Sequence, residues 1–308
     1  MGQPSVENCR AVKMGLVAQV AQSYFELMAL DNELAIVRRT LEARREGVRL
    51  AEIRFKGGLT SEIVFQQAKV ELAKTATMVP DLERRISLKE SEIALLTGDF
   101  PYAVNRNVLP EEIQLPDALP LGLPSTLLER RPDIRKAERE LMAAHAEVGL
   151  AYTNMFPRLA LTATLGAESE TLRDLLKSPY SYLAGNLLSP LFAMGKNRAA
   201  LKAKRAAYEG AVAEYEKTVL TAFKETHDAI INFNKIKDIY ESRRQLAEAS
   251  RTAVELAQLQ YINGVIGYLD LLDAQRNYFD AQVSLSNAVC NKQLMIINLY
   301  KALGGGWK

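Results

Sequence analysis

The placement of proline constrains this chain more than any other feature of its sequence. Of the 11 prolines, six lie between Pro101 and Pro132, and none follows Pro190. A proline in a helix interior removes a backbone hydrogen bond and clashes with the preceding turn. The proline-poor stretches on either side of the middle therefore predict long helices. Length alone would suggest about two compact domains, and the proline pattern argues against that arrangement.

The first proline-poor stretch has the periodicity of a single long helix. From about Ser5 to Phe55, apolar residues recur at steps of three and four, which places them on one helix face. A helix of this size is roughly 75 Å long and needs a partner, as in a coiled coil. A second helix is predicted over residues 61–97, with a kink at Pro80.

The apolar period changes from that of a helix to that of a strand between about Asn154 and Ala193. The alternation predicts a β-hairpin with strands over residues 156–166 and 182–192. Each strand has the ~10 residues of a tilted membrane-spanning strand. A hairpin packed on a soluble core is the alternative. One face of the first strand carries four apolar residues: Leu159, Leu161, Ala163 and Leu165.

An internal repeat relates the two ends of the chain. A shift of 206 positions aligns residues 38–98 with residues 244–304 without gaps. The shift superposes Gly58 on Gly264 and Gly98 on Gly304, so the turn and the helix end of one helical hairpin recur in the other. Heptads alone would align apolar residues but not these glycines. We therefore expect two duplicated helical hairpins.

The predicted fold is mainly α, with long antiparallel coiled-coil-like hairpins in two repeats and one membrane β-hairpin. The expected segments are a first-repeat helical hairpin, an irregular connector, a helix, the β-hairpin and a second-repeat helical hairpin. In that order, the five segments cover residues 5–98, 99–131, 132–153, 154–194 and 195–303.

Composition argues against several classes of function. With 39 basic and 37 acidic residues the net charge is +2, which gives no electrostatic case for binding nucleic acid. Cys9 and Cys290 form no zinc or disulfide pattern, and each is interpreted as a small buried hydrophobic residue. His145 and His227 have no neighbours at ligand spacing. Without a nucleotide-binding or hydrolase motif, we expect no metal, no cofactor and no enzymatic activity.

The most specific motif is LPSTLLERRPDIRKAE at residues 123–138. It resembles the pattern LPSxLLxRRPDIRxAE of the TolC-like outer-membrane efflux factors, in the NodT/OprM-like lipoprotein branch that serves RND pumps. Similar matches are FPRLALT at residues 156–162 and YLDLLDAQR at residues 268–276. The resemblance covers essentially residues 10–308. Two positions depart from the pattern, since Ala193 replaces an aspartate and His145 an asparagine. Within the motif, Arg130, Arg131 and Asp133 are interpreted as salt-bridging residues at a helix start.

The resemblance implies a TolC-like architecture and a transport function. Such proteins are homotrimers with a β-barrel in the outer membrane and an α-helical tunnel in the periplasm. The implied role is a passive export duct in a tripartite efflux pump, with a periplasmic adaptor, an inner-membrane RND-type transporter and outer-membrane lipid as partners. The apolar face of the first strand would then contact lipid. A soluble coiled-coil scaffold or adaptor is the alternative, and it fits the helices but not the alternating hairpin.

The resemblance also places a periplasmic gate on this sequence. Its expected residues are Tyr261, Leu269, Asp270 and Asp273, next to tip turns at Gly57, Gly58 and Gly264. Threefold symmetry would bring copies of Asp273 into a ring that attracts cations. Leu269 would add an apolar constriction, and the hydroxyl of Tyr261 would hydrogen-bond to a neighbouring helix.

The start of the sequence differs from the family pattern. The first residues are polar and show neither a signal peptide nor the residues expected before a lipidated cysteine, and no apolar run is long enough for a membrane helix. The family has two halves with one β-hairpin each, whereas this sequence carries one hairpin. We therefore expect an N-terminally truncated member, of which a trimer would supply six strands where the family has twelve.

Overall fold

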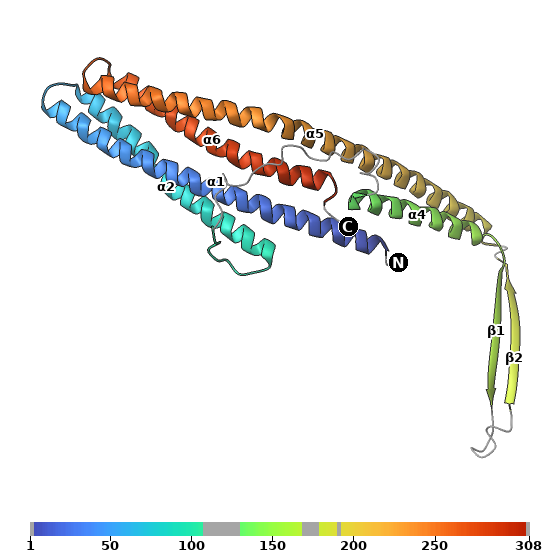
Figure 1. The fold of residues 1–308 in the computed structure, drawn as a ribbon. Helices are drawn as coiled ribbons and strands as arrows, with labels where there is room; N and C mark the ends of the chain where they lie inside the picture. Colours follow the sequence, from blue (N-terminus) through green and yellow to red (C-terminus); the bar gives the residue numbers. More distant parts are fainter. Residues whose placement is uncertain (1–2, 107–129, 168–178, 190–191, 306–308) are drawn as a thin grey trace. The chain divides into compact units, whose positions relative to one another are not determined.

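A computed structural model describes residues 3–106, 130–167, 179–189 and 192–305 of the chain. The elements follow one another as α1 (Gln3–Lys56), α2 (Glu62–Thr97), α4 (Pro132–Thr153), β1 (Arg158–Ala167), β2 (Pro179–Leu188), α5 (Met194–Ile262) and α6 (Tyr268–Ala302) (Figure 1). The predicted mainly helical fold with one β-hairpin is confirmed. Most of the predicted connector, residues 107–129, lies outside the described residues, as does the first half of the LPSTLLERRPDIRKAE motif.

The chain divides into two compact units. Unit 1 contains Met1–Asn8 and Asp133–Thr221, and unit 2 contains Cys9–Pro132 and Ala222–Lys308. Helix α5 contributes its first part to unit 1 and its last part to unit 2. Unit 1 therefore holds nearly all of α4 and the two strands, and unit 2 holds most of α1, all of α2 and α6, and the last part of α5.

The main apolar core of unit 2 joins α1 to α2. The α1 residues in it are spaced by three and four, as the periodicity predicts. They pack against Leu82, Ile86 and Ile93 of α2, and Phe279 of α6 packs against the same cluster. Helix α2 continues through Pro80 without interruption. The α1 residues are Leu27, Leu30, Leu34 and Val37.

The aligned glycines end their helices in the same way, as the alignment of the two repeats predicts. Gly58 and Gly264 have φ angles of 69° and 72°, and Gly98 and Gly304 have φ angles of 77° and 88°. At each site the glycine N–H donates to the carbonyl three residues back, and the next N–H donates to the carbonyl five residues back. This is the Schellman motif, whose left-handed residue is easiest for glycine.

A buried arginine ties the end of α6 to the segment before α4. Arg131 donates to the carbonyl oxygen of Ala302 at 3.1 Å and pairs with Glu225 of α5 at 2.6 Å. A Cβ atom at Gly304 would lie 3.2 Å from the Arg131 side chain and backbone. For Arg131, the interpretation as a structural salt-bridging residue is confirmed. The two cysteines differ from each other, since Cys290 is buried but Cys9 is exposed, so the interpretation of Cys9 as a buried residue is wrong.

In unit 1 the two strands form an antiparallel pair. The pairing runs from Arg158 opposite Leu188 to Ala167 opposite Pro179. Both strands begin next to a proline, Pro157 and Pro179, which is tolerated at a strand start because no ladder donor is needed there. The strands are therefore displaced from the predicted 156–166 and 182–192, and the second ends at Leu188. Asn197 of α5 donates to the carbonyl of Asn154, in the segment between α4 and β1, at 2.9 Å.

Candidate functional site

The turns of the two helical hairpins lie together at one end of unit 2, which we call the tip (residues 54–61 and 261–268). Arg54 of α1 donates to the main-chain carbonyl of Tyr261 at 3.1 Å. The guanidinium of Arg54 also lies over the Tyr261 ring, 4.6 Å from its centroid. The first repeat therefore contacts the second at the tip. Gly58 and Gly264 occupy the left-handed positions of these turns, whereas Gly57 does not.

Tyr261 is positioned by its ring and main chain. Its side chain is only 6% exposed, and its ring meets the Tyr268 ring edge-on at 5.9 Å. The Tyr261 hydroxyl is buried and has no hydrogen-bond partner among the described residues. The expected hydrogen bond from this hydroxyl to a neighbouring helix is therefore not formed within the described chain. The cation–π contact with Arg54 connects Tyr261 to α1 instead.

The other predicted gate residues lie on the exposed surface at the start of α6. Leu269 is 59% exposed. The Asp270 carboxylate accepts a hydrogen bond from the Gly267 N–H at 3.0 Å, which caps the first turn of α6. Asp273 is exposed, and its carboxylate lies 3.9 Å from Nη1 of Arg276. The two aspartates thus differ, because Asp270 is hydrogen-bonded to the main chain, whereas Asp273 is exposed and has only a long ion pair with Arg276.

Sequence reasoning missed an ion-pair cluster next to the tip. Glu71 of α2 is buried, and its carboxylate accepts from Arg44 of α1 at 2.9 Å and from Arg276 of α6 at 2.5 Å. Lys74 adds a third bond at 3.2 Å. The hydrogen bond from Arg276, together with the hydrogen bond from Lys74 and the charge of Arg44, holds the pKa of Glu71 below its ordinary value against the opposing effect of burial. We call Arg44, Glu71 and Arg276 the tip brace, because it joins three helices and both repeats.

One sequence signal pointed to this cluster. Glu71 follows Ala68 by three positions and precedes Thr75 by four, and all three residues are buried on the same face of α2. A carboxylate in a buried stripe requires a cationic partner. Its partners could not be identified, because Arg44 and Arg276 are distant in sequence. The repeat gives no help either, since the 206-residue shift pairs Glu71 with Asn277 and Arg276 with Val70.

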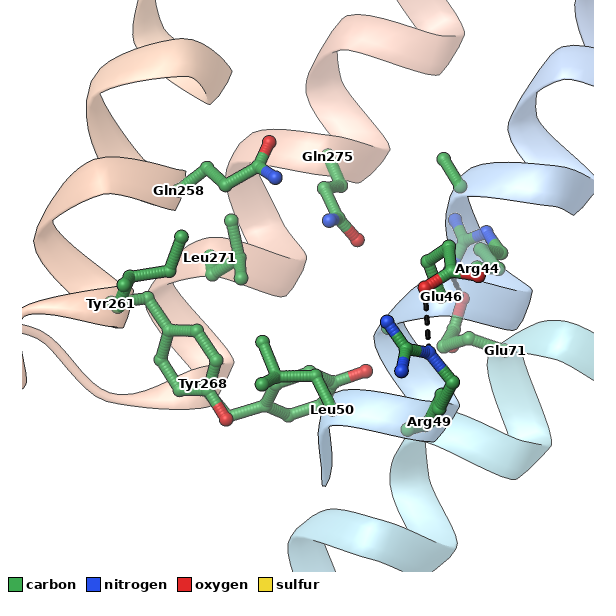
Figure 2. Close-up of a pocket in the computed structure, with 14 residues that line it drawn as sticks. Arg44, Glu46, Arg49, Leu50, Glu71, Gln258, Tyr261, Tyr268, Leu271 and Gln275 are labelled. Carbon is green, nitrogen blue, oxygen red and sulfur yellow. Dashed lines mark hydrogen bonds and ion pairs between the residues drawn. The ribbon is translucent and has the colours of Figure 1, made fainter. Parts of the chain in front are cut away.

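A cavity of about 230 Å³ lies between the two hairpins beside the tip brace. Figure 2 shows Arg44 and Glu71 on one side of it and Tyr261, Tyr268 and Gln258 on the other. Glu46, which also lines it, is paired with Arg49 at 2.8 Å. We call this space the tip cavity. It is lined by residues of α1, α2, α5 and α6, so it lies at the junction of the two repeats.

The β-hairpin of unit 1 has two chemically different faces. Residues that pair directly across the strands point to the same side. The register therefore places Leu159 and Leu187 on one face, together with the pair Ala163 and Leu183, whereas the other face carries polar pairs such as Thr164 with Tyr182. The leucines of the apolar face are between 67% and 84% exposed: Leu159, Leu161, Leu165, Leu183 and Leu187.

Two further features are absent from the residues that the structure describes. Within these ranges, no helix carries an apolar segment of the length and hydropathy needed to cross a bilayer. In the same part of the chain, no three histidine, cysteine, aspartate or glutamate side chains are grouped so that a metal ion could bind.

The sequence matches the family described as Outer membrane efflux protein over residues 3–99 and 123–305. The outer membrane protein OprJ of Pseudomonas aeruginosa is 35% identical over 98% of this chain and 64% of its own length. The solvent efflux pump outer membrane protein SrpC of Pseudomonas putida is 34% identical over 97% of this chain and 64% of its own length. The chain thus spans about 64% of the length of these relatives.

Solved structures show the same fold. The outer-membrane channel OprN superposes with a TM-score of 0.86 and 30% identity, covering 99% of this chain and 69% of its own. The open state of the MtrE outer membrane channel of Neisseria gonorrhoeae has a TM-score of 0.83 and 28% identity, covering 98% of this chain and 69% of its own. Together with the family match, these similarities establish that the chain belongs to the outer membrane efflux protein family.

Proposed function

We propose that this chain forms part of the wall of a passive efflux duct in the outer membrane. The observation that carries the proposal is the register of the β-hairpin, which gathers exposed leucines on one face, attached to long helical hairpins. Burial of a leucine side chain in an apolar medium contributes ~1.5–3 kcal/mol. An exposed leucine face therefore favours lipid contact. In this proposal Leu159, Leu161, Ala163 and Leu165 face lipid, and Thr162 and Thr164 face the lumen.

The proposed assembly is a homotrimer. Residues 5–98 and 195–303 would line the periplasmic tunnel, residues 154–194 would enter the membrane, and residues 99–131 would form the connector at mid-height. A periplasmic adaptor and an inner-membrane RND-type transporter would complete the pump. The named relatives support this role, since SrpC belongs to a solvent efflux pump and CusC of Escherichia coli to a cation efflux system. These names span different solutes, so we propose no substrate class and assign selectivity to the transporter.

The proposed gate is the tip. Around a threefold axis, the exposed carboxylates of Asp273 would form a ring, with Leu269 one turn away as an apolar constriction. Asp270 would hold the start of α6 in shape through its bond to Gly267. The tip brace would keep α6 against α1 and α2, so opening would require the bond between Arg276 and Glu71 to break or rearrange.

The proposal assigns no chemistry to the chain. The family transports solutes, and energy would come from the inner-membrane partner. The duct and the coiled-coil scaffold are separated by measuring conductance after the full chain is reconstituted in planar bilayers. A duct gives discrete current steps above the protein-free baseline. A folded, membrane-bound chain that leaves the baseline unchanged supports the scaffold and contradicts the duct.

A further inference from the structure

The tip cavity contains buried hydrogen-bond donors without partners. Arg44 is 8% exposed and lines the cavity; its Nη1 bonds Glu71, but its Nε has no hydrogen-bond partner among the described residues. Tyr261 lines the opposite side, and its buried hydroxyl is equally unpartnered within the described ranges. Buried polar groups without partners are costly, by about 1–3 kcal/mol each. Two such groups on one cavity indicate that water or another hydrogen-bonding molecule occupies it.

The charges around the cavity identify the kind of occupant. Both carboxylates on its wall are already engaged, Glu71 by three cations and Glu46 by Arg49. The wall itself carries two arginines and two carboxylates. The side chains that contact the wall residues add three cations, whereas the one further carboxylate is that of exposed Asp273. An excess of positive charge beside unpartnered donors favours an anion with acceptor oxygens. The cations are Arg44, Arg49, Arg54, Lys74 and Arg276.

We propose that the tip cavity binds a small oxyanion, a carboxylate or a phosphate, between Nε of Arg44 and the hydroxyl of Tyr261. The cavity, at about 230 Å³, holds such an ion together with several waters, since a water occupies ~30 Å³. The anion would connect α1 of the first repeat to α5 of the second, next to the existing contact between Arg54 and Tyr261. It would thereby add a removable link to the tip. The inference concerns binding and does not depend on the duct function.

The test is calorimetric titration of the full chain in detergent with sodium phosphate and, separately, sodium acetate, in chloride buffer of matched ionic strength. We expect saturable binding of about one ion per chain for at least one of the two. Arg44→Lys keeps a cation for Glu71 but removes Nε, and Tyr261→Phe keeps the ring but removes the hydroxyl. Each substitution should weaken binding about tenfold, because each removes one hydrogen bond to a charged group.

Two exposed positions provide matched controls. Arg38→Lys changes an exposed arginine of α1 that is paired with Glu83, and Tyr152→Phe removes an exposed hydroxyl of α4. Both should bind the anion as the unchanged chain does, with all four variants checked for helical content by circular dichroism. Phosphate binding without acetate binding assigns the phosphate class, and the reverse assigns the carboxylate class. No binding of either ion, or equal binding by Tyr261→Phe and the unchanged chain, overturns the proposal and leaves a water-filled cavity.

Discussion

Glu71 and Arg276 form a hydrogen-bonded ion pair across the two repeats of the chain, 2.5 Å apart and 205 positions distant in sequence. Glu71 lies in α2 of the first repeat and Arg276 in α6 of the second. Arg44 of α1 bonds the other carboxylate oxygen of Glu71. The duplicated hairpins are therefore connected at the tip by a charge set that the duplication itself does not repeat. This asymmetry gives each hairpin a different part in the proposed gate.

The first prediction concerns the stability of this connection. Glu71→Gln leaves Arg44 buried, at 8% exposure, without a counter-charge. Breaking a buried ion pair from one side typically costs ~3–5 kcal/mol. We expect a loss of this order in the free energy of unfolding, measured by denaturant titration. Glu83→Gln is the matched control, because Glu83 pairs with Arg38 on the exposed surface, where a pair contributes ~0–1 kcal/mol. Equal effects of the two changes would contradict the importance of the tip brace.

The second prediction is the acid dependence of the same brace. The hydrogen bond from Arg276 is the largest cause of the lowered pKa of Glu71 in the folded chain. In the unfolded chain, the Glu71 carboxylate becomes protonated at a higher pH, near ~4.3. Stability from Glu71 is therefore complete above the unfolded pKa and is lost as the pH falls through the folded pKa.

Unfolding midpoints at pH 7, 5, 4 and 3 measure this loss. The unfolding midpoints of the unchanged chain and of Glu71→Gln should approach each other as the pH falls, because a protonated Glu71 side chain resembles that of glutamine. A difference that stays constant down to pH 3 would show that the pKa of Glu71 is not lowered in the folded chain.

Much of the fold was predictable, because it depends on local signals. Proline-free periodic stretches predicted the long helices, and aligned glycines predicted the turns at Gly58 and Gly264, where only the left-handed conformation closes the Schellman motif. The β-hairpin was predicted from its alternation, whereas its strand bounds differ from the prediction, since the second strand runs from Pro179 to Leu188. Local sequence patterns were sufficient where a helix, turn or strand is specified by residues within or next to it.

The site was predicted less completely, because its contacts join distant segments. The exposure of Leu269 and Asp273 agrees with a surface role, but no feature of the sequence connected Glu71 to Arg44 and Arg276. The Tyr261 hydroxyl was expected to hydrogen-bond, and the structure instead positions the ring against Arg54. Side-chain pairing across helices depends on packing, which periodicity does not specify.

The third prediction separates neighbouring glycines at the first turn. Gly58 has a φ angle of 69°, in the left-handed region, whereas Gly57 has no positive φ angle. A Cβ atom at Gly57 would lie 3.4 Å from the Ile53 carbonyl oxygen, which is an ordinary contact. Gly58→Ala should destabilise the chain by ~1–2 kcal/mol, the cost of the left-handed conformation. Gly57→Ala should change the unfolding free energy by less than about 0.5 kcal/mol. Thermal unfolding of both variants provides the comparison, and the reverse ranking would refute the turn geometry.

The fourth prediction assigns different effects to the two aspartates of α6. Asp270→Ala removes the acceptor of the Gly267 N–H and should reduce stability by ~1 kcal/mol, as loss of a helix cap does. Asp273→Ala removes an exposed carboxylate and should leave stability nearly unchanged, while raising the conductance of the reconstituted channel by loosening the tip. Conductance that is unchanged by Asp273→Ala in a conducting channel would count against the gate.

The central claim is that copies of this chain converge at the tip of α6 around a threefold axis. The most direct measurement is cross-linking of Asp273→Cys in a Cys9→Ser background, which leaves only the buried Cys290. A short three-armed maleimide should join three copies into a covalent trimer. Asp81→Cys, an exposed position on α2, should give labelled monomer instead. Labelled monomer as the only product from Asp273→Cys would contradict the claim.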